Sequence, residues 1–161
     1  MNWEKIYDIQ AVHILLCRSD ISTNKSVNEI PQRNLSTTIN HVNNKRVWGV
    51  TIGSELVASF TLSNTPSFEI SSNLGFPVSN NPVYLSRLCV DSRIVNEEPF
   101  LGLQAIKKAI EIAREENCDF IRCEVNPKIR KVLDTFLNFG FDMTSFRDGD
   151  NKRYLYRNLY D

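Results

Sequence analysis

The sequence predicts an α/β (α+β) fold, in which helices pack on a mixed β-sheet. Two apolar, β-branched runs, RVWGVTI and ELVASFTL, flank Gly53-Ser54, which is the pattern of a β-hairpin. Farther along, strand-like and helix-like segments alternate, and a strand–helix–strand order makes the two strands parallel through a right-handed crossover. The runs FDMTSF and RYLYRNLY, separated by Asp148-Gly149-Asp150, predict a closing hairpin, so the sheet has parallel and antiparallel neighbours.

The N-terminal region, from Met1 to about Lys45, has the least regular pattern. Its opening, WEKIYDIQAVHILLC, fits the helical and the strand period equally well, so both assignments stay open. The stretch that follows is rich in Asn, Ser and Thr, which indicates surface loops and short helices. Within it, NLSTTINHV is compatible with one or two helical turns.

After the hairpin, a long polar connector, SNTPSFEISSNLGFPVSNNP, leads to the next strand. FEI within this connector is a candidate short strand. The run VYLSRLCV predicts a strand over Val83 to Val90. Because side chains alternate along a strand, one face is predicted to carry Tyr84, Ser86, Leu88 and Val90, and the other Val83, Leu85, Arg87 and Cys89.

The C-terminal region contains two predicted helices around a strand. The helix beginning near Leu101 is amphipathic, with an apolar face made of Ala105, Ile106, Ala109, Ile110 and Ala113. DFIRCEV is the next strand. Asn126 is a predicted N-cap with Pro127 at the first helical position, and Gly140 is placed to end that second helix. The second helix has an apolar stripe of Ile129, Val132, Leu133, Phe136 and Leu137.

Composition limits the classes of function. A chain of 161 residues with 42% hydrophobic and 24% charged residues predicts a single globular domain over residues 1–161. Nineteen basic residues balance nineteen acidic ones, so the overall charge does not favour nucleic acid, and no apolar run is long enough to span a membrane.

The cysteines and the N-terminal segment bear on metal binding and location. Four cysteines without a CxxC pair and two histidines give poor support for a metal site, so we expect none. Reduced, buried thiols are typical of the cytosol. The segment MNWEKIYDIQ does not resemble a signal peptide, and we expect a cytoplasmic protein.

In their order and spacing, these segments resemble the GNAT (Gcn5-related N-acetyltransferase) superfamily. The segments concerned are the hairpin VWGVTIGSELVASFTL, the strand YLSRLCV feeding the helix GLQAIKKAIEIA, and a late NFGF. The resemblance runs from about Val47 to Leu159. It implies a mostly antiparallel, twisted sheet with helices on both sides. It also implies transfer of an acetyl group from acetyl-CoA to a primary amine of a small molecule or peptide, by direct attack in a ternary complex and without a metal.

The resemblance further implies which residues contact the cofactor. A helix N-terminus offers N–H donors and a favourable dipole to a pyrophosphate, and a strand N–H can stabilise the thioester oxygen as negative charge develops. The corresponding cofactor-binding residues are Leu88, Cys89, Val90, Leu101, Gly102, Leu103, Gln104 and Asn126. Close helix–sheet packing explains Gly102 equally well.

The sequence departs from the family pattern at four positions. Glu97 replaces an Arg or Gln of the phosphate loop, and Phe100 replaces its first glycine. Phe136 stands where a tyrosine acid is frequent, and Tyr84 where several members have a glutamate base. The candidate catalytic residues are therefore Tyr84, as an acid or a water-orienting group, Ser86 on the same predicted strand face, and Glu69 as an upstream base.

Two other functions stay open. The pattern S-R-L-x-V, Ser86 to Val90, is similar to a strand of the acyl-homoserine-lactone synthases and related N-acyl amino acid synthases, and to one in phage Mom-type proteins. A donor on an acyl carrier protein would need a basic docking surface at Lys107, Lys108 or the 128–131 run. The departures also suit a non-catalytic GNAT-like module. Arg87 is compatible with a phosphate or carboxylate clamp or with a surface arginine, and relatives are commonly dimers.

Overall fold

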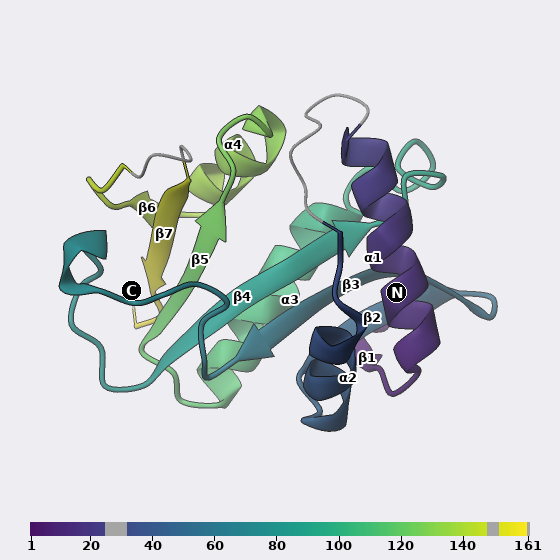
Figure 1. Cartoon of the computed structure of the whole chain (residues 1–161), viewed down its shortest axis with the longest axis horizontal. Helices are drawn as coiled ribbons and strands as arrows, with labels where there is room; N and C mark the ends of the chain where they lie inside the picture. Colours follow the sequence, from purple (N-terminus) through teal and green to yellow (C-terminus); the bar gives the residue numbers. More distant parts are fainter. Residues whose placement is uncertain (25–31, 148–151, 161) are drawn as a thin grey trace. The chain divides into compact units, whose positions relative to one another are not determined.

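The computed structural model describes residues 1–24, 32–147 and 152–160 (Figure 1). In chain order, its elements are β1 (Glu4–Lys5), α1 (Ile9–Asn24), α2 (Leu35–Asn43), β2 (Val47–Ile52), β3 (Glu55–Ser63), the 3-10 turn η1 (Ser72–Leu74), β4 (Pro82–Val90), α3 (Leu101–Glu115), β5 (Phe120–Val125), α4 (Arg130–Asn138), β6 (Asp142–Met143) and β7 (Arg153–Asn158). The strands form one mostly antiparallel sheet in the order β1-β2-β3-β4-β5-β7-β6. The mixed α/β sheet predicted from the sequence is confirmed.

The chain divides into two compact units. The first unit comprises Met1–Thr61 and Arg87–Ala105, and the second comprises Leu62–Ser86 and Ile106–Asp161. Strands β3 and β4 and helix α3 each begin in one unit and end in the other.

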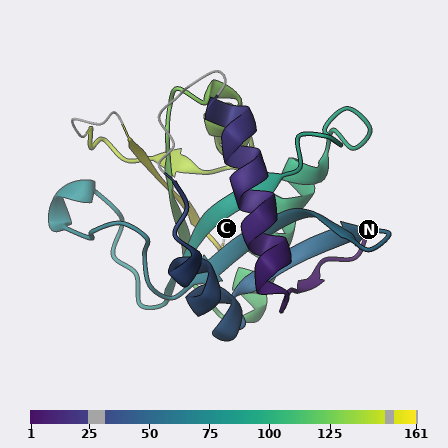
Figure 2. The ribbon, with the colours of Figure 1, turned by 45° about the vertical axis from the view of Figure 1, so that its right-hand side comes forward.

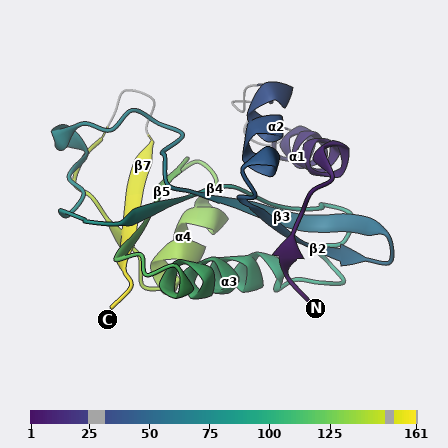
Figure 3. The same ribbon diagram turned by 90° about the horizontal axis from the view of Figure 1, so that it is seen from below.

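In the first unit, α1 and α2 pack on one face of the β2–β3 hairpin (Figures 2 and 3). The helices contribute Val12, Leu15, Leu16 and Val42 to a buried cluster with Ile6, Val47, Leu56 and Cys89. Both helices begin with local caps, because the Asp8 and Asn34 side chains accept bonds from Ala11 N and Ser36 N. The ambiguous N-terminal segment is therefore helical from Ile9, and NLSTTINHV forms α2.

A β-bulge shapes the other face of this hairpin. Val50 pairs with Ala58 but Thr51 pairs with Leu56, so Val57 is an extra residue in β3. Val57 and Ala58 consequently join one cluster with Val50 and with Leu101 from the first turn of α3, while Leu56 packs toward α1. The predicted hairpin and its turn at Gly53-Ser54 are confirmed.

In the second unit, β5 lies between β4 and β7 (Figure 1). It pairs in parallel with the start of β4, from Pro82↔Phe120 to Tyr84↔Arg122, and antiparallel with β7 along its whole length. The predicted strand–helix–strand crossover is thus confirmed. The predicted closing hairpin appears as the antiparallel pair β6–β7, and its Asp148-Gly149-Asp150 turn lies outside the described residues.

Gly140 terminates α4 as predicted. Its φ is +81°, its N–H donates to Leu137 O, and Phe141 N donates to Phe136 O, which is the Schellman pattern. The rings of Phe136 and Phe141 meet edge to face at 5.0 Å and supply the apolar contact that accompanies this motif.

Three local predictions are wrong. Helix α4 begins at Arg130 rather than Pro127, because Asn126 Oδ1 accepts from Lys128 N and closes a separate turn before the helix. FEI is not a strand: Phe68 packs its ring against Tyr84 and Tyr154 instead.

The third wrong prediction is the strict alternation of side chains between the two faces of the strand along Val83–Val90. Arg87 has φ +54°, which interrupts the pleat of β4. In addition, the predicted stripe of α4 is only partly buried: Phe136 is in the core, whereas Val132 and Leu137 are exposed.

Candidate functional site

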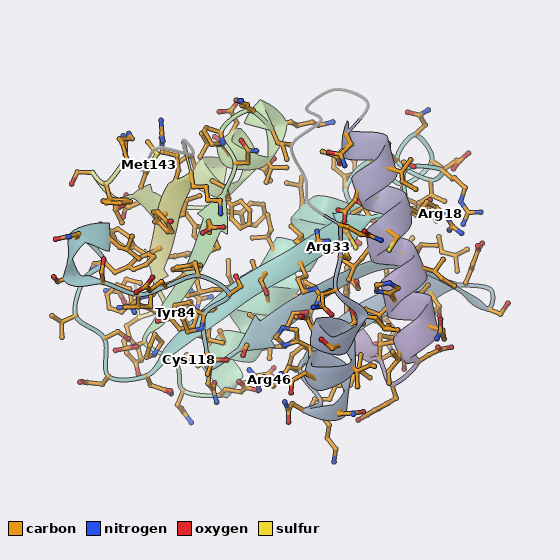
Figure 4. The ribbon with its side chains drawn as sticks, viewed as in Figure 1. Arg18, Arg33, Arg46, Tyr84, Cys118 and Met143 are labelled. Atoms are coloured by element: carbon orange, nitrogen blue, oxygen red, sulfur yellow. The ribbon has the colours of Figure 1, made fainter. Side chains whose placement is uncertain are left out.

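The turn from β4 to α3 is held by the buried Asp91 carboxylate. Asp91 Oδ2 accepts from Arg93 Nη2 at 2.7 Å and from Arg18 Nη1 at 3.0 Å, and Oδ1 accepts from Arg93 N. Asp91 N donates to Val57 O at 2.7 Å, and Arg93 also binds Glu55. The end of β4 is therefore tied to α1 and to the bulge of β3, and the turn has a defined conformation. Figure 4 shows Arg18 beside α1.

The positive charge of Arg93 keeps the Asp91 carboxylate ionised. The hydrogen bond from Arg93 lowers the pKa of Asp91 to about 2, against the opposing effect of burial. Asp91 is thus ionised at neutral pH. It anchors the turn and is not available as a base.

The N-terminus of α3 offers unused donors. The first helical i→i−4 bond runs from Gln104 N to Phe100 O, and Leu101 N is bonded to Glu98 O. Within the part of the chain that the structure describes, the N–H groups of Gly102 and Leu103 have no such partner. A Cβ placed on Gly102 would meet no atom within 4 Å, so the space beside Gly102 is open. An anion at this position would gain two N–H bonds and the helix dipole.

The two departures in the loop do not fill this space. The side chains of Glu97 and Phe100 are both exposed, and Phe100 is 63% accessible. The N–H groups of Glu97 and Glu98 are occupied by Ile94 O, so the turn itself offers fewer donors than a glycine-rich loop would.

The end of β4 holds the three other predicted cofactor residues. Cys89 is buried, its Sγ lies 3.5 Å from Ser59 Oγ, and burial raises the pKa of its thiol to about 11. It is therefore a packed thiol rather than a nucleophile. Val90 packs against the cluster that contains Leu101 from the first turn of α3. Cys89 instead belongs to the cluster formed with α1 and α2, and Leu88 is partly exposed.

Tyr84, Ser86 and Glu69 lie in the second unit. Tyr84 is buried, and its phenolic oxygen accepts from Arg122 Nη1 at 2.9 Å (Tyr84 is labelled in Figure 4). Arg122 also donates to Pro77 O and lies 4.8 Å from the Phe76 ring centroid. This guanidinium fixes the tyrosine ring and leaves the phenolic proton free to be donated elsewhere.

A cavity of about 330 Å³ opens in the same unit. It is lined by Glu69, Ser71, Leu74, Phe146 and Tyr154. Glu69 thus faces a pocket with two aromatic rings, an environment suited to a cationic amine. Tyr84 and Ser86 do not line this cavity, although Tyr84 contacts the same aromatic cluster through Phe68.

Asn126 does not have a free side chain. Its Oδ1 accepts from Lys128 N, and its carbonyl accepts from Ile129 N. A cofactor contact by Asn126 would therefore use the remaining amide N–H₂ group.

The sequence reasoning missed Asp91, Arg18 and Arg122. Asp91 immediately follows a strand and precedes Arg93 by two residues, which is a recognisable pattern for a turn closed by an ion pair. Arg122 is a lone cation within the run FIRCEV, which signals an interior arginine with buried acceptors. Arg18, which binds Asp91 from α1, had no local signal in the sequence.

No helix within residues 1–24, 32–147 and 152–160 is long and apolar enough to cross a membrane. Over the same residues, no cluster of three or more His, Cys, Asp or Glu side chains is arranged to hold a metal ion.

The fold is that of the GNAT acetyltransferases. A GNAT-family acetyltransferase from Listeria monocytogenes superposes with a TM-score of 0.75 at 13% identity, covering 98% of this chain and 94% of that one. A GNAT-family acetyltransferase from Staphylococcus aureus gives 0.69 at 19% identity, with 98% of each chain covered. The PaiA N-acetyltransferase from Thermoplasma acidophilum in complex with coenzyme A gives 0.70 at 14% identity, again over 98% of each chain. No protein-family model matches the sequence, and no curated protein matches it either.

Proposed function

We propose that this chain is a divergent member of the GNAT superfamily, a single-domain N-acetyltransferase that moves an acetyl group from acetyl-CoA to a primary amine. The observation that carries the proposal is the pair of unused N–H groups at Gly102 and Leu103, at the start of the helix that follows β4, with open space beside Gly102. Its fold is shared with a structure that contains coenzyme A. The pyrophosphate of acetyl-CoA fits these donors, which supply hydrogen bonds and positive potential without a side-chain cation.

The end of β4 would bind the thioester of acetyl-CoA. A backbone N–H among Leu88–Val90 would hold the thioester oxygen as negative charge develops on it during attack. Arg87 supports this assignment, because its left-handed conformation turns the backbone at the residue before Leu88. The buried Asp91 keeps the end of the strand in place.

The acceptor amine must lose a proton, and the departing thiolate must gain one. Glu69, with its carboxylate at the aromatic cavity, is the proposed base, directly or through water. Tyr84 is the proposed acid, since Arg122 occupies its oxygen but not its proton. Ser86 is the proposed group that orients a water or the amine.

The first test is thermal unfolding with saturating acetyl-CoA, and with CoA in a second arm. Ligand at 100 times its dissociation constant stabilises by about 2.7 kcal/mol. At roughly 2–4 °C per kcal/mol for this chain length, Tm should rise by about 5–11 °C. Turnover with a panel of amines would then identify the acceptor.

The alternatives make different predictions in the same experiment. A carrier-dependent enzyme would show no shift with CoA, but would use an acylated carrier protein in a salt-sensitive way. A non-catalytic module would use neither donor. An absent shift together with absent turnover would overturn the proposed acetyltransferase.

A further inference from the structure

Arg87 is a strained residue in a strand. Among the described residues, three that are not glycine have positive φ: Lys45, Arg87 and Asn117. Lys45 and Asn117 lie in turns, whereas Arg87 lies within β4. A left-handed conformation costs free energy for a residue with a Cβ, and such strain is retained mostly where it places a side chain for a purpose.

The strain places a guanidinium beneath α2. Arg87 Nη2 donates to Thr38 Oγ1 at 2.8 Å, and Thr38 is buried on the inner face of that helix. Nη1 is buried too, but it has no hydrogen-bond partner. The guanidinium of Arg87 is half-buried, so it has lost much of its water without gaining a full set of acceptors.

Arg87 also lacks a counter-charge in the part of the chain that the structure describes. The acid near it is Asp20, and Arg33 engages both oxygens of that carboxylate, at 2.6 and 3.0 Å. Burial, followed by the charge of Arg33, lowers the pKa of Arg87. Figure 4 shows Arg33 beside α1, in the same unit.

The remaining polar groups do not offset this charge. His13 Nδ1 lies 3.4 Å from Thr38 Oγ1, and Cys17 Sγ lies 3.6 Å from His13 Nε2. Burial and then Arg87 lower the pKa of His41, so its imidazole is neutral at pH 7. Among Arg87, Arg33 and Asp20, two guanidinium charges therefore stand against one carboxylate.

We propose that Arg87, braced by Thr38, binds a carboxylate of a small ligand through its half-buried guanidinium. Among the described residues this half-buried cation has no anion of its own, because Arg33 occupies Asp20, and a carboxylate supplies both a countercharge and an acceptor. The planar guanidinium suits a planar carboxylate. If the proposed acetyltransferase function holds, on which this last step rests, the acceptor is an amine that carries a carboxylate, as an amino acid does. Arg87 then anchors it one residue from Leu88.

The test uses the whole protein and simple anions. Sodium acetate and glycine are titrated at ionic strength held constant with sodium chloride, with inorganic phosphate in a further arm. His41 supplies the signal: the chain has only two histidines, and a His13→Gln variant assigns their NMR resonances. Bound carboxylate neutralises Arg87, so acetate should raise the pKa of His41 and raise Tm.

Variants separate a binding role from a structural one. Arg87→Gln keeps a donor for Thr38 but removes the charge, and it should weaken acetate binding at least tenfold while leaving Tm of the free protein unchanged or higher. Arg46→Gln is the matched control, since it removes an arginine of the same unit that lies over Trp48. It should leave acetate binding unchanged.

Several outcomes would overturn the inference. Equal acetate effects in Arg87→Gln and the unmodified protein would do so, as would no effect beyond that of sodium chloride. A preference for phosphate over carboxylates would assign the site to a phosphate group, such as one of CoA, and would reject the carboxylate. Because acetate binding is measured without CoA, failure here is distinct from failure to bind acetyl-CoA.

Discussion

Arg93 Nη2 lies 2.7 Å from Asp91 Oδ2, and both side chains belong to the turn that joins β4 to α3. The carboxylate of Asp91 is inaccessible to solvent, while the Arg93 side chain is half-exposed. The buried carboxylate of Asp91 thus holds the turn through hydrogen bonds. This explains how the turn is ordered without a glycine-rich sequence.

Asp91→Asn should destabilise the protein. The amide keeps the bond to Arg93 N but leaves Arg18 and Arg93 without their shared anion, which should cost about 2 kcal/mol and lower Tm by about 4–8 °C. Differential scanning calorimetry measures this loss. Glu55→Gln is the control: it removes the exposed partner of Arg93 and should cost at most about 1 kcal/mol. Equal losses in the two variants would contradict the anchoring role of Asp91.

Low pH should lower the free energy of unfolding through protonation of Asp91. The pKa of Asp91 is about 2 in the folded protein, compared with 3.8 when unperturbed, because Arg93 stabilises the ionised form. The unfolded chain therefore takes up the proton first as pH falls. The stabilisation is complete above the unfolded value and is lost between about pH 4 and pH 2, in proportion to the proton uptake. Urea midpoints across this range should fall less steeply in Asp91→Asn; parallel curves would rule the prediction out.

Tyr84→Phe should lower kcat strongly but lower stability only slightly. The variant removes the proposed acid and leaves Arg122 Nη1 without its acceptor, so we expect kcat to fall by roughly 10²- to 10⁴-fold and stability by about 1–2 kcal/mol. Steady-state kinetics and calorimetry measure the two effects. Tyr156→Phe makes the same change on β7, on a ring that packs against Phe120, and should leave kcat unchanged. Normal turnover in Tyr84→Phe would remove Tyr84 from the mechanism.

Two glycine-to-alanine changes should have opposite effects on stability. At Gly102 a Cβ meets open space in the first turn of α3, so Gly102→Ala should stabilise the free protein by up to about 1 kcal/mol. At Gly140, φ is +81°, and alanine should destabilise by about 1–2 kcal/mol.

Gly102→Ala also reports on the proposed cofactor site. Its methyl group would enter the open space beside Gly102, where the pyrophosphate is proposed to bind, so the Tm shift produced by acetyl-CoA should be smaller than in the unmodified protein. Lys107→Ala, on the exposed side of α3, is the matched control and should keep the full shift. An undiminished shift in Gly102→Ala would place the pyrophosphate elsewhere.

Local patterns allowed much of the fold to be predicted. The β2–β3 hairpin, the face of α3 and the cap at Gly140 each depend on residues within a few positions of one another, so periodicity and turn chemistry are sufficient. The start of α4 was wrong by three residues because Asn126 caps a turn as readily as a helix. The bend at Arg87 could not be read from the sequence, because arginine has no local preference for positive φ.

The candidate site was predictable only in part. The start of α3 could be placed, since a helix N-terminus follows from its pattern. The ion pairs around Asp91 and Asp20 join residues far apart in the chain, and charge alone does not reveal such partners. The sequence left Arg87 open between a phosphate or carboxylate clamp and a surface arginine, and its orphaned Nη1 is visible only in the structure.

The four cysteines, none of which is in a disulfide, allow local opening of each unit to be measured separately. Cys89 lies buried in the first unit, and Cys118 and Cys123 lie buried in the second, where burial also raises the pKa of Cys123. Such thiols react with a disulfide reagent only after the surrounding structure opens. Cys17 is partly exposed and should react first. The labelling rates of the other three therefore measure how often each unit opens, and whether a ligand bound to one unit slows opening of the other.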